Sequence, residues 1–176
     1  SPALLAVDTG ADFILYPIGL SPSTVEFYLS HVLRMTEASH FYLLTLATDG
    51  DMEASGTSNY TATTATLTKS TTASRVYMGA QSLRVQGSGG APRAESVSIN
   101  VVEGKQYHMS VWAQADVGVA QLVAYDSTGA AEIDSANHNE EGWVQIVLPA
   151  FTIPASGEVL TARLEGTGAT DDLYFD

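Results

Sequence analysis

The sequence predicts an all-β protein: a jelly-roll β-sandwich with extra strands at its N-terminus. Short apolar segments recur between turn residues at near-even spacing, which is typical of sandwiches and jelly rolls. Charged residues make up only 15% of the chain, and Thr, Ser, Gly and Ala take their place, as in many β-rich surface proteins. Cysteine is absent, so neither a disulfide framework nor a thiolate metal site can form.

The first part of the chain contributes three predicted strands, at residues 3–7, 13–16 and 25–33, separated by Gly-containing turns. Residues 25–35 also carry some helical periodicity, but their β-branched and aromatic content favours a strand at least as well.

A weak internal repeat relates residues 23–30 (STVEFYLS) to residues 169–176 (ATDDLYFD) at an offset of 146 residues, about the length of a sandwich domain. The simplest interpretation is two tandem modules, with residues 1–38 the tail end of the first. The alternative is coincidence over eight residues. If the repeat is real, residues 1–38 must pair with the second domain, another subunit or a missing piece, because native proteins cover strand edges.

We therefore divide the chain into N-terminal strands (residues 1–39) and a sandwich domain (residues 40–176). Within residues 107–113, Tyr107, Met109 and Val111 share one face, whereas Trp112 lies on the other. Residues 57–74 hold eight threonines, which indicate either a solvent-facing β-ribbon or an O-glycosylated stretch. The strands predicted for the second unit are residues 41–46, 61–68, 81–85, 94–101, 107–115, 120–126, 142–148, 158–165 and 171–175.

The charge balance limits the kinds of partner. Acidic residues number 20 against 7 basic ones, a formal net charge of −13, so phosphate backbones are repelled and nucleic acid is not expected as a partner. The longest apolar runs are far shorter than the ~20 residues that span a bilayer, so membrane insertion is not expected either. The acidic excess is compatible with binding a hard cation such as calcium.

Four segments stand in order along the chain: TDGDME (48–53), AQSLRV (80–85), VEGKQYHMSVWA (102–113) and DDLYFD (171–176). They are similar, in the same order, to the motifs N-G-D-F-E, G-x-x-S-L-x-V, V-x-x-G-x-x-Y-x-x-S-x-W and Y-x-D-D-V. Over roughly residues 46–176 the chain therefore resembles carbohydrate-binding modules of families 4 and 9, which have a galactose-binding-like jelly-roll fold. Trp143 is similar to the family's W-x-x position. Two departures are Asp49 in place of the opening Asn and a chain that stops at the first Asp of the last motif.

The resemblance implies a structural calcium ion where the first and last strands of the module meet. It places that role on Glu53 and Asp176, with Asp51 and main-chain carbonyls completing the six to eight oxygens that calcium prefers. The alternative is that these carboxylates are solvated strand ends.

The resemblance also implies glycan binding by exposed aromatic rings and neighbouring polar groups. The candidate rings are Tyr60, Tyr77 and Tyr125, of which Tyr77 lies in a loop-like stretch, and Asn137 and Asn139 could donate hydrogen bonds from a polar loop. An ordinary loop is the simpler interpretation of residues 137–140. Trp112 and Trp143 match packing positions of the family, so we expect them in the core.

Catalysis is not expected. The sequence has no G-x-S-x-G nucleophile elbow, and its four histidines show no H-x-H or H-E-x-x-H spacing for zinc.

Two functions remain open for an extracellular, virion-surface or cell-surface protein. The first is a non-catalytic structural or adhesion component of an assembly, such as a decoration, fibre, surface-layer or filament subunit, joined to other subunits through residues 1–38. The second is a glycan-binding module of a larger secreted polysaccharide-active protein. The first predicts self-association and the second predicts a monomer, and fold analogy alone cannot choose between them.

Overall fold

The computed structural model describes residues 4–8, 12–17, 35–36, 40–41, 49–139, 141–155, 157 and 159–176, and before residue 49 only the backbone. Within these ranges the regular structure is β-strand apart from one turn of 3-10 helix, η1 (Ala73–Arg75). No helix in the described part of the chain is long and apolar enough to cross a membrane. The predicted all-β class is confirmed.

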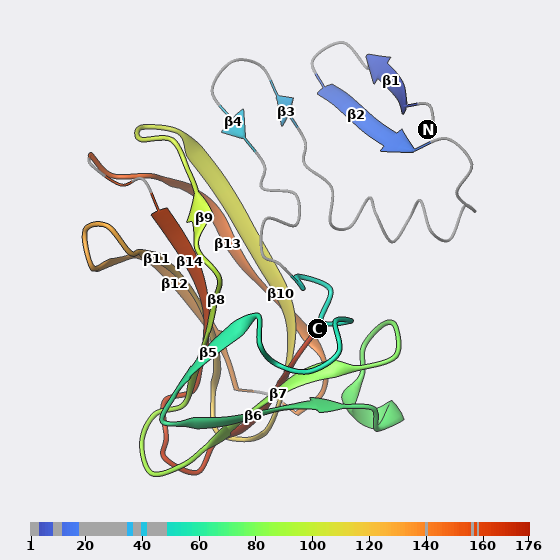
Figure 1. Ribbon diagram of the computed structural model, residues 1–176, viewed down its shortest axis with the longest axis vertical. Coiled ribbons are helices and arrows are strands. Elements are labelled where there is room, and N and C mark those ends of the chain that lie inside the picture. Colours follow the sequence, from blue (N-terminus) through green and yellow to red (C-terminus); the bar gives the residue numbers. More distant parts are fainter. Residues whose placement is uncertain are drawn as a thin grey trace.

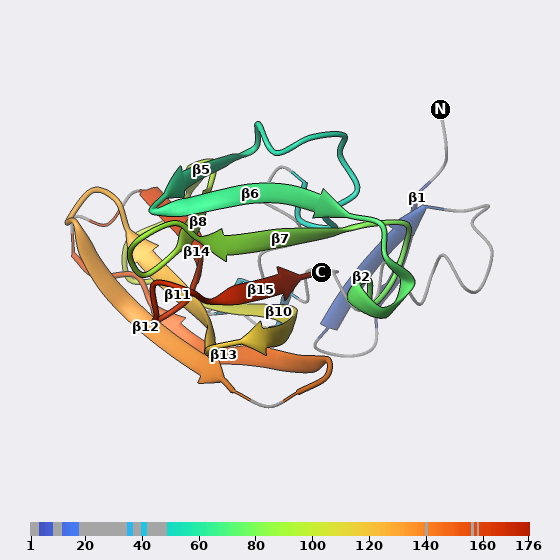
Figure 2. The ribbon, with the colours of Figure 1, turned by 90° about the horizontal axis from the view of Figure 1, so that it is seen from below.

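Two largely antiparallel sheets form the sandwich, and Figure 2 shows β15 between β10 and β7, next to the C-terminus. Sheet A follows the order β13–β10–β15–β7–β6 and comprises β6 (Ala65–Ser70), β7 (Ser82–Gly87), β10 (Gln106–Val117), β13 (Val144–Thr152) and β15 (Asp172–Phe175). Sheet B follows the order β12–β11–β14–β8–β5 and comprises β5 (Tyr60–Thr63), β8 (Arg93–Ser96), β11 (Ala120–Asp126), β12 (Ala131–His138) and β14 (Val159–Glu165), with β9 (Ile99–Asn100) paired to β14.

Four short strands precede the sandwich and continue sheet A (Figure 1). They join it where His40 pairs in parallel with Gln106 of β10. The predicted strands at residues 3–7 and 13–16 match the first two of them, but residues 23–30 and most of the predicted strand 41–46 lie outside the described residues. The division at residue 39 therefore stays a prediction. The four strands are β1 (Leu4–Asp8), β2 (Asp12–Pro17), β3 (Met35–Thr36) and β4 (His40–Phe41).

The core lies between the inner faces of the two sheets. Along β10, Val111 and Ala113 point into it, whereas Trp112 and Gln114 point to the outer face of sheet A, as period-2 alternation predicts. Each fully buried aliphatic side chain contributes roughly 1.5–3 kcal/mol. The most deeply buried apolar side chains are Leu83, Val85, Leu122, Leu148, Ile153, Leu160, Leu173 and Phe175.

The Thr-rich stretch differs from the prediction, because residues 61–68 form parts of two strands in different sheets rather than one strand. The chain turns at Thr64, whose φ of 48° is unusual for a β-branched residue. The Thr64 hydroxyl hydrogen-bonds to the carbonyls of Thr63 and Ala91, which stabilises this turn. The threonines at 61, 63, 66 and 68 are exposed, as the β-ribbon interpretation predicts.

Strand β12 has no counterpart among the predicted strands, and the polar loop expected at residues 137–140 overlaps its end. The strand carries Ile133 as its one large apolar residue, so it lacks the apolar run expected of a strand. As an edge strand it needs only to pair with β11, and Asn137 lies opposite Gln121 in that ladder. Asn137 is thus a strand residue, and Asn139 follows the strand end.

Candidate functional site

Three aromatic side chains meet on the outer face of sheet A, and we call Tyr77, Trp112 and Trp143 the aromatic cluster. The rings of Tyr77 and Trp112 are stacked, with centroids 3.8 Å apart and an interplanar angle of 17°. Trp143 lies 5.9 Å from Tyr77 at 51°. Trp112 comes from β10, Trp143 directly precedes β13, and Tyr77 follows η1. Stacked and tilted aromatic contacts add stability beyond the area that they bury.

Both tryptophans correct the expectation that they fill the core. They are half-buried and do not belong to the core cluster between the sheets. Trp112 points outward because its neighbours Val111 and Ala113 occupy the inward positions of β10. Tyr77 covers Trp112 from outside and remains 38% exposed, so the outermost ring of the cluster is the one that the sequence placed at the surface.

Two polar atoms on this side of the molecule lack hydrogen-bond partners among the described residues. Gln114 Oε1 and Trp143 Nε1 are both buried, and the Gln114 side chain follows Trp112 on the outer face of β10. A buried polar atom without a partner costs roughly 1–3 kcal/mol. One atom is an acceptor and the other a donor, so a hydroxyl group, which can donate and accept, matches them chemically.

Two arginine–aspartate pairs lie on the same face, one joining η1 to β10 and the other joining β7 to β15. Arg75 pairs with Asp116 at 2.6 Å. Arg84 binds Asp172 through both Nε (2.7 Å) and Nη2 (2.6 Å), a bidentate contact that raises the pKa of Arg84 further above its usual value. Both guanidinium groups lie over the ring of Tyr174, at 5.3 and 5.8 Å from its centroid. Arg75 and Arg84 are therefore each already paired with an aspartate of this chain.

The loop that carries Tyr77 is held by two carboxylates, one near the start of the sandwich sequence (Glu53) and one at its end (Asp176). Asp176 Oδ2 accepts hydrogen bonds from the N–H groups of Tyr77 (2.8 Å) and Met78 (3.0 Å). Glu53 Oε1 accepts from those of Ala80 (2.8 Å) and Gln81 (3.2 Å).

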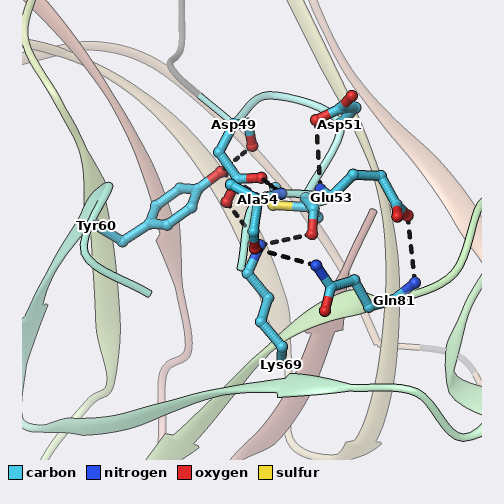
Figure 3. Close-up of polar contacts among 8 residues, drawn as sticks. Asp49, Asp51, Glu53, Ala54, Tyr60, Lys69 and Gln81 are labelled. Atoms are coloured by element: carbon cyan, nitrogen blue, oxygen red, sulfur yellow. Dashed lines mark hydrogen bonds and ion pairs between the residues drawn. The ribbon is translucent and has the colours of Figure 1, made fainter. Parts of the chain in front are cut away.

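These carboxylates are the ones that the resemblance proposed for calcium. In Figure 3 the carboxylate of Asp51 accepts from the N–H of Glu53, at 3.3 Å. The carboxylate of Glu53 points to the N–H of Gln81. Among the described residues there is no group of three or more acidic or histidine side chains that could hold a metal ion. The carboxylate oxygens described here face N–H donors, which do not suit a cation, and calcium binding stays a prediction.

Tyr60 lies in the core, 8% exposed, so its ring is not available to a ligand. Its hydroxyl donates to the Asp49 carbonyl at 2.6 Å, and burial raises the pKa of Tyr60 well above its ordinary value (Figure 3). Alternation alone could not reveal this, because Tyr60 begins a strand whose other residues are exposed.

Tyr125 lies on the opposite side of the molecule, on the outer face of sheet B. The Arg163 guanidinium carbon lies 3.0 Å from the centre of its ring, so one face of the ring is covered. Arg163 also pairs with Glu95, which completes a charged network on this face together with Arg93 and Glu165.

The predicted glycan residues thus fall in different places. Tyr77 is on sheet A, Tyr125 is on sheet B, Tyr60 is in the core, and the exposed Asn137 and Asn139 are at the β12 edge. The polar neighbours of the aromatic cluster were not predicted. Alternation along β10 after Trp112 was the one signal that could have indicated Gln114 and Asp116.

The family model described as "Carbohydrate binding domain" matches residues 45–171. No curated protein matches the chain.

Three solved structures illustrate the shared fold. "Family 16 Carbohydrate Binding Module-2" is 16% identical, with 74% of this chain and 95% of that chain covered and a TM-score of 0.59. TmCBM61, solved in complex with β-1,4-galactotriose, is 15% identical over 77% and 93% of the two chains, with a TM-score of 0.53. The enzymatically active domain of tailspike protein 4 of bacteriophage CBA120 is 13% identical, with 73% of this chain but 20% of that chain covered and a TM-score of 0.57.

Proposed function

The chain belongs to the carbohydrate binding domain family, and from this membership we propose that it is a glycan-binding module whose ligand stacks on Tyr77. The observation that carries the proposal is the stack itself: an exposed ring supported from below by Trp112 at 3.8 Å. A rigid aromatic face exposed to solvent offers apolar contact to one face of a sugar ring at low cost in side-chain entropy.

The surroundings of the stack support the same role. Gln114 Oε1 is an acceptor and Trp143 Nε1 is a donor, neither has a partner among the described residues, and together they complement a hydroxyl group. Tyr125 is a weaker candidate because its side chain is only partly exposed, whereas Tyr77 is 38% exposed.

The module would act without catalysis as part of a larger extracellular or particle-surface protein. One candidate context is a secreted polysaccharide-active protein, where the module holds the enzyme on its substrate. TmCBM61 was solved with a galactose oligosaccharide, which supports a polysaccharide chain as the class of ligand.

The second candidate context is a structural or adhesion subunit of an assembly such as a virion fibre. One observation favours it: β1–β4 continue sheet A beyond β10, and strands added at a sheet edge are a common way to join subunits. The fold shared with a phage tailspike is compatible with it. Light scattering of the full chain separates the contexts, since a subunit is expected to self-associate and a module to be monomeric.

Glycan binding is tested by screening the full chain on a glycan array, first with calcium and then with a chelator. We expect binding to one class of glycan, lost in Tyr77→Ala and retained in Tyr125→Ala, which changes an aromatic residue on the opposite sheet. Loss of binding in chelator would support the calcium prediction for Asp51, Glu53 and Asp176. A folded wild-type protein that binds no glycan would contradict the proposed function.

A further inference from the structure

We propose that Glu53 and Asp176 form a carboxylate clamp that positions Tyr77 on Trp112, an inference that rests on the proposed function. The clamp consists of the two carboxylates and the four main-chain N–H groups that they accept from, at residues 77, 78, 80 and 81. Glu53 and Asp176 would thus be positioning residues for glycan binding without contacting the glycan.

Asp176 connects both partners of the aromatic stack. Its main chain exchanges two hydrogen bonds with Trp112, N–H to carbonyl in both directions, at 2.9 and 3.0 Å. Its side chain accepts from the N–H groups of Tyr77 and Met78. One residue therefore sets the position of the lower ring through the sheet ladder and of the upper ring through its carboxylate.

Glu53 fixes the other end of the same loop. Its Oε1 atom accepts from Ala80 and Gln81, and the Gln81 side chain donates to the Ala54 carbonyl at 3.0 Å, which adds a second tie to the same segment. A carboxylate that accepts from adjacent N–H groups forms charge-assisted bonds, which are about twice as strong as neutral ones.

Gly79 lies between the two halves of the clamp and is required by it. Its φ of 78° suits glycine, and a Cβ there would clash with the Glu53 carboxylate. Because that carboxylate is the far end of a flexible side chain, Gly79→Ala would displace it without disturbing the core. Gly56 has a nearly equal φ of 81°, but a Cβ at this position would meet nothing within 4 Å, so Gly56→Ala carries the same backbone strain without the clash.

The experiment compares Glu53→Ala, Asp176→Ala and Gly79→Ala with Gly56→Ala and wild type, all as the full chain. Glycan affinity is measured by calorimetry with the glycan found on the array. Acrylamide quenching of tryptophan emission is measured without glycan, because the only two tryptophans of the chain are Trp112 and Trp143. Thermal melts confirm that each variant is folded.

We expect the three clamp variants to bind glycan about tenfold more weakly, because a Tyr77 side chain that is no longer held on Trp112 must be ordered when the glycan binds. Their tryptophans should be quenched as strongly as those of Tyr77→Ala, whereas Gly56→Ala should match wild type in both measurements. Glu53→Gln keeps an acceptor oxygen and should recover part of the affinity lost in Glu53→Ala.

Folded clamp variants with wild-type affinity and wild-type quenching, beside a Tyr77→Ala variant that loses binding, would overturn the inference and leave the proposed function standing. A wild-type protein that binds no glycan would overturn the proposed function instead. The quenching data would then still decide whether the carboxylates hold Tyr77 on Trp112.

Discussion

The ammonium group of Lys69 lies 2.6 Å from the carboxylate of Asp49, and the two side chains are only 7% and 0% exposed (Figure 3). Lys69 also donates to the Met52 carbonyl at 2.6 Å, and Asp49 accepts from the N–H of Ala54. Asp49 has φ of 66°, a conformation that Asp and Asn tolerate better than most residues. The resembled motif has Asn here, so Lys69 supplies the countercharge that the Asp requires.

Replacing Lys69 with Met leaves the buried Asp49 carboxylate unpaired. We expect Lys69→Met to lower the free energy of unfolding by about 3 kcal/mol, measured by urea denaturation. The double variant Lys69→Met/Asp49→Asn should recover most of this loss, since the amide oxygen can still accept from Ala54. A single variant as stable as wild type would show that the pair contributes nothing to the fold.

Replacing Glu165 with Gln should stabilise the protein at neutral pH. Burial raises the pKa of Glu165, and the opposing charges of Arg93 and Arg163 do not fully offset it. The stability associated with its protonated form is present below the unfolded pKa of about 4.3 and is lost as pH rises through the folded pKa. The Tm of Glu165→Gln should therefore exceed that of wild type at pH 7, and the two should converge near pH 4.

A lower Tm for Glu165→Gln at pH 7 would instead mean that the 3.3 Å contact with Arg93 outweighs the burial of the carboxylate.

The fold could be predicted from sequence wherever one face of a strand is clearly apolar. The alternation of β10 puts Val111 and Trp112 on opposite faces, as the structure has them, but the family resemblance led us to expect Trp112 in the core, and that expectation was wrong. Strand β12 could not be found, because an edge strand with Ile133 as its one large apolar residue is defined by its partner β11. The turn at Thr64 could not be found either, because threonine favours strands and seldom adopts a positive φ.

The site could be predicted only in part, for a different reason. The turn residues around Tyr77 predict a surface ring, and the structure places it 38% exposed. The ring stacks on Trp112 of β10, and the N–H of Tyr77 donates to Asp176, 99 residues away in sequence; no local pattern encodes either contact. The prediction for Tyr60 was wrong for a similar reason, since its hydroxyl finds the Asp49 carbonyl only when the loop has folded.

Gln114 offers a test that separates binding from stability. The residue is 8% exposed with Oε1 unpartnered among the described residues, so Gln114→Met removes an unsatisfied acceptor and keeps the volume. We expect the free energy of unfolding to stay equal or rise by about 1 kcal/mol while glycan affinity falls about tenfold. Gln145→Met, at an exposed position opposite Trp112 in the ladder, should give no gain in stability. A stability loss of several kcal/mol in Gln114→Met would contradict this, because it would mean that the amide is well satisfied.

Gly118, in the turn between β10 and β11, is expected to tolerate a side chain poorly, because it faces the buried carboxylate of Asp171. That carboxylate is 3% exposed and accepts from the N–H groups of Thr167 (2.8 Å) and Gly168 (2.9 Å), so it has no room to move. Gly118→Ala adds a clash with Asp171 to the ~1–2 kcal/mol of strain that an L-residue meets at φ 94°. Gly142→Ala, at φ 102° with open space around it, measures the strain alone. Urea denaturation should show Gly118→Ala about 1–3 kcal/mol less stable than Gly142→Ala, which is the usual cost of overpacking. Equal losses of stability would mean that the Asp171 side chain moves aside to make room for the methyl group.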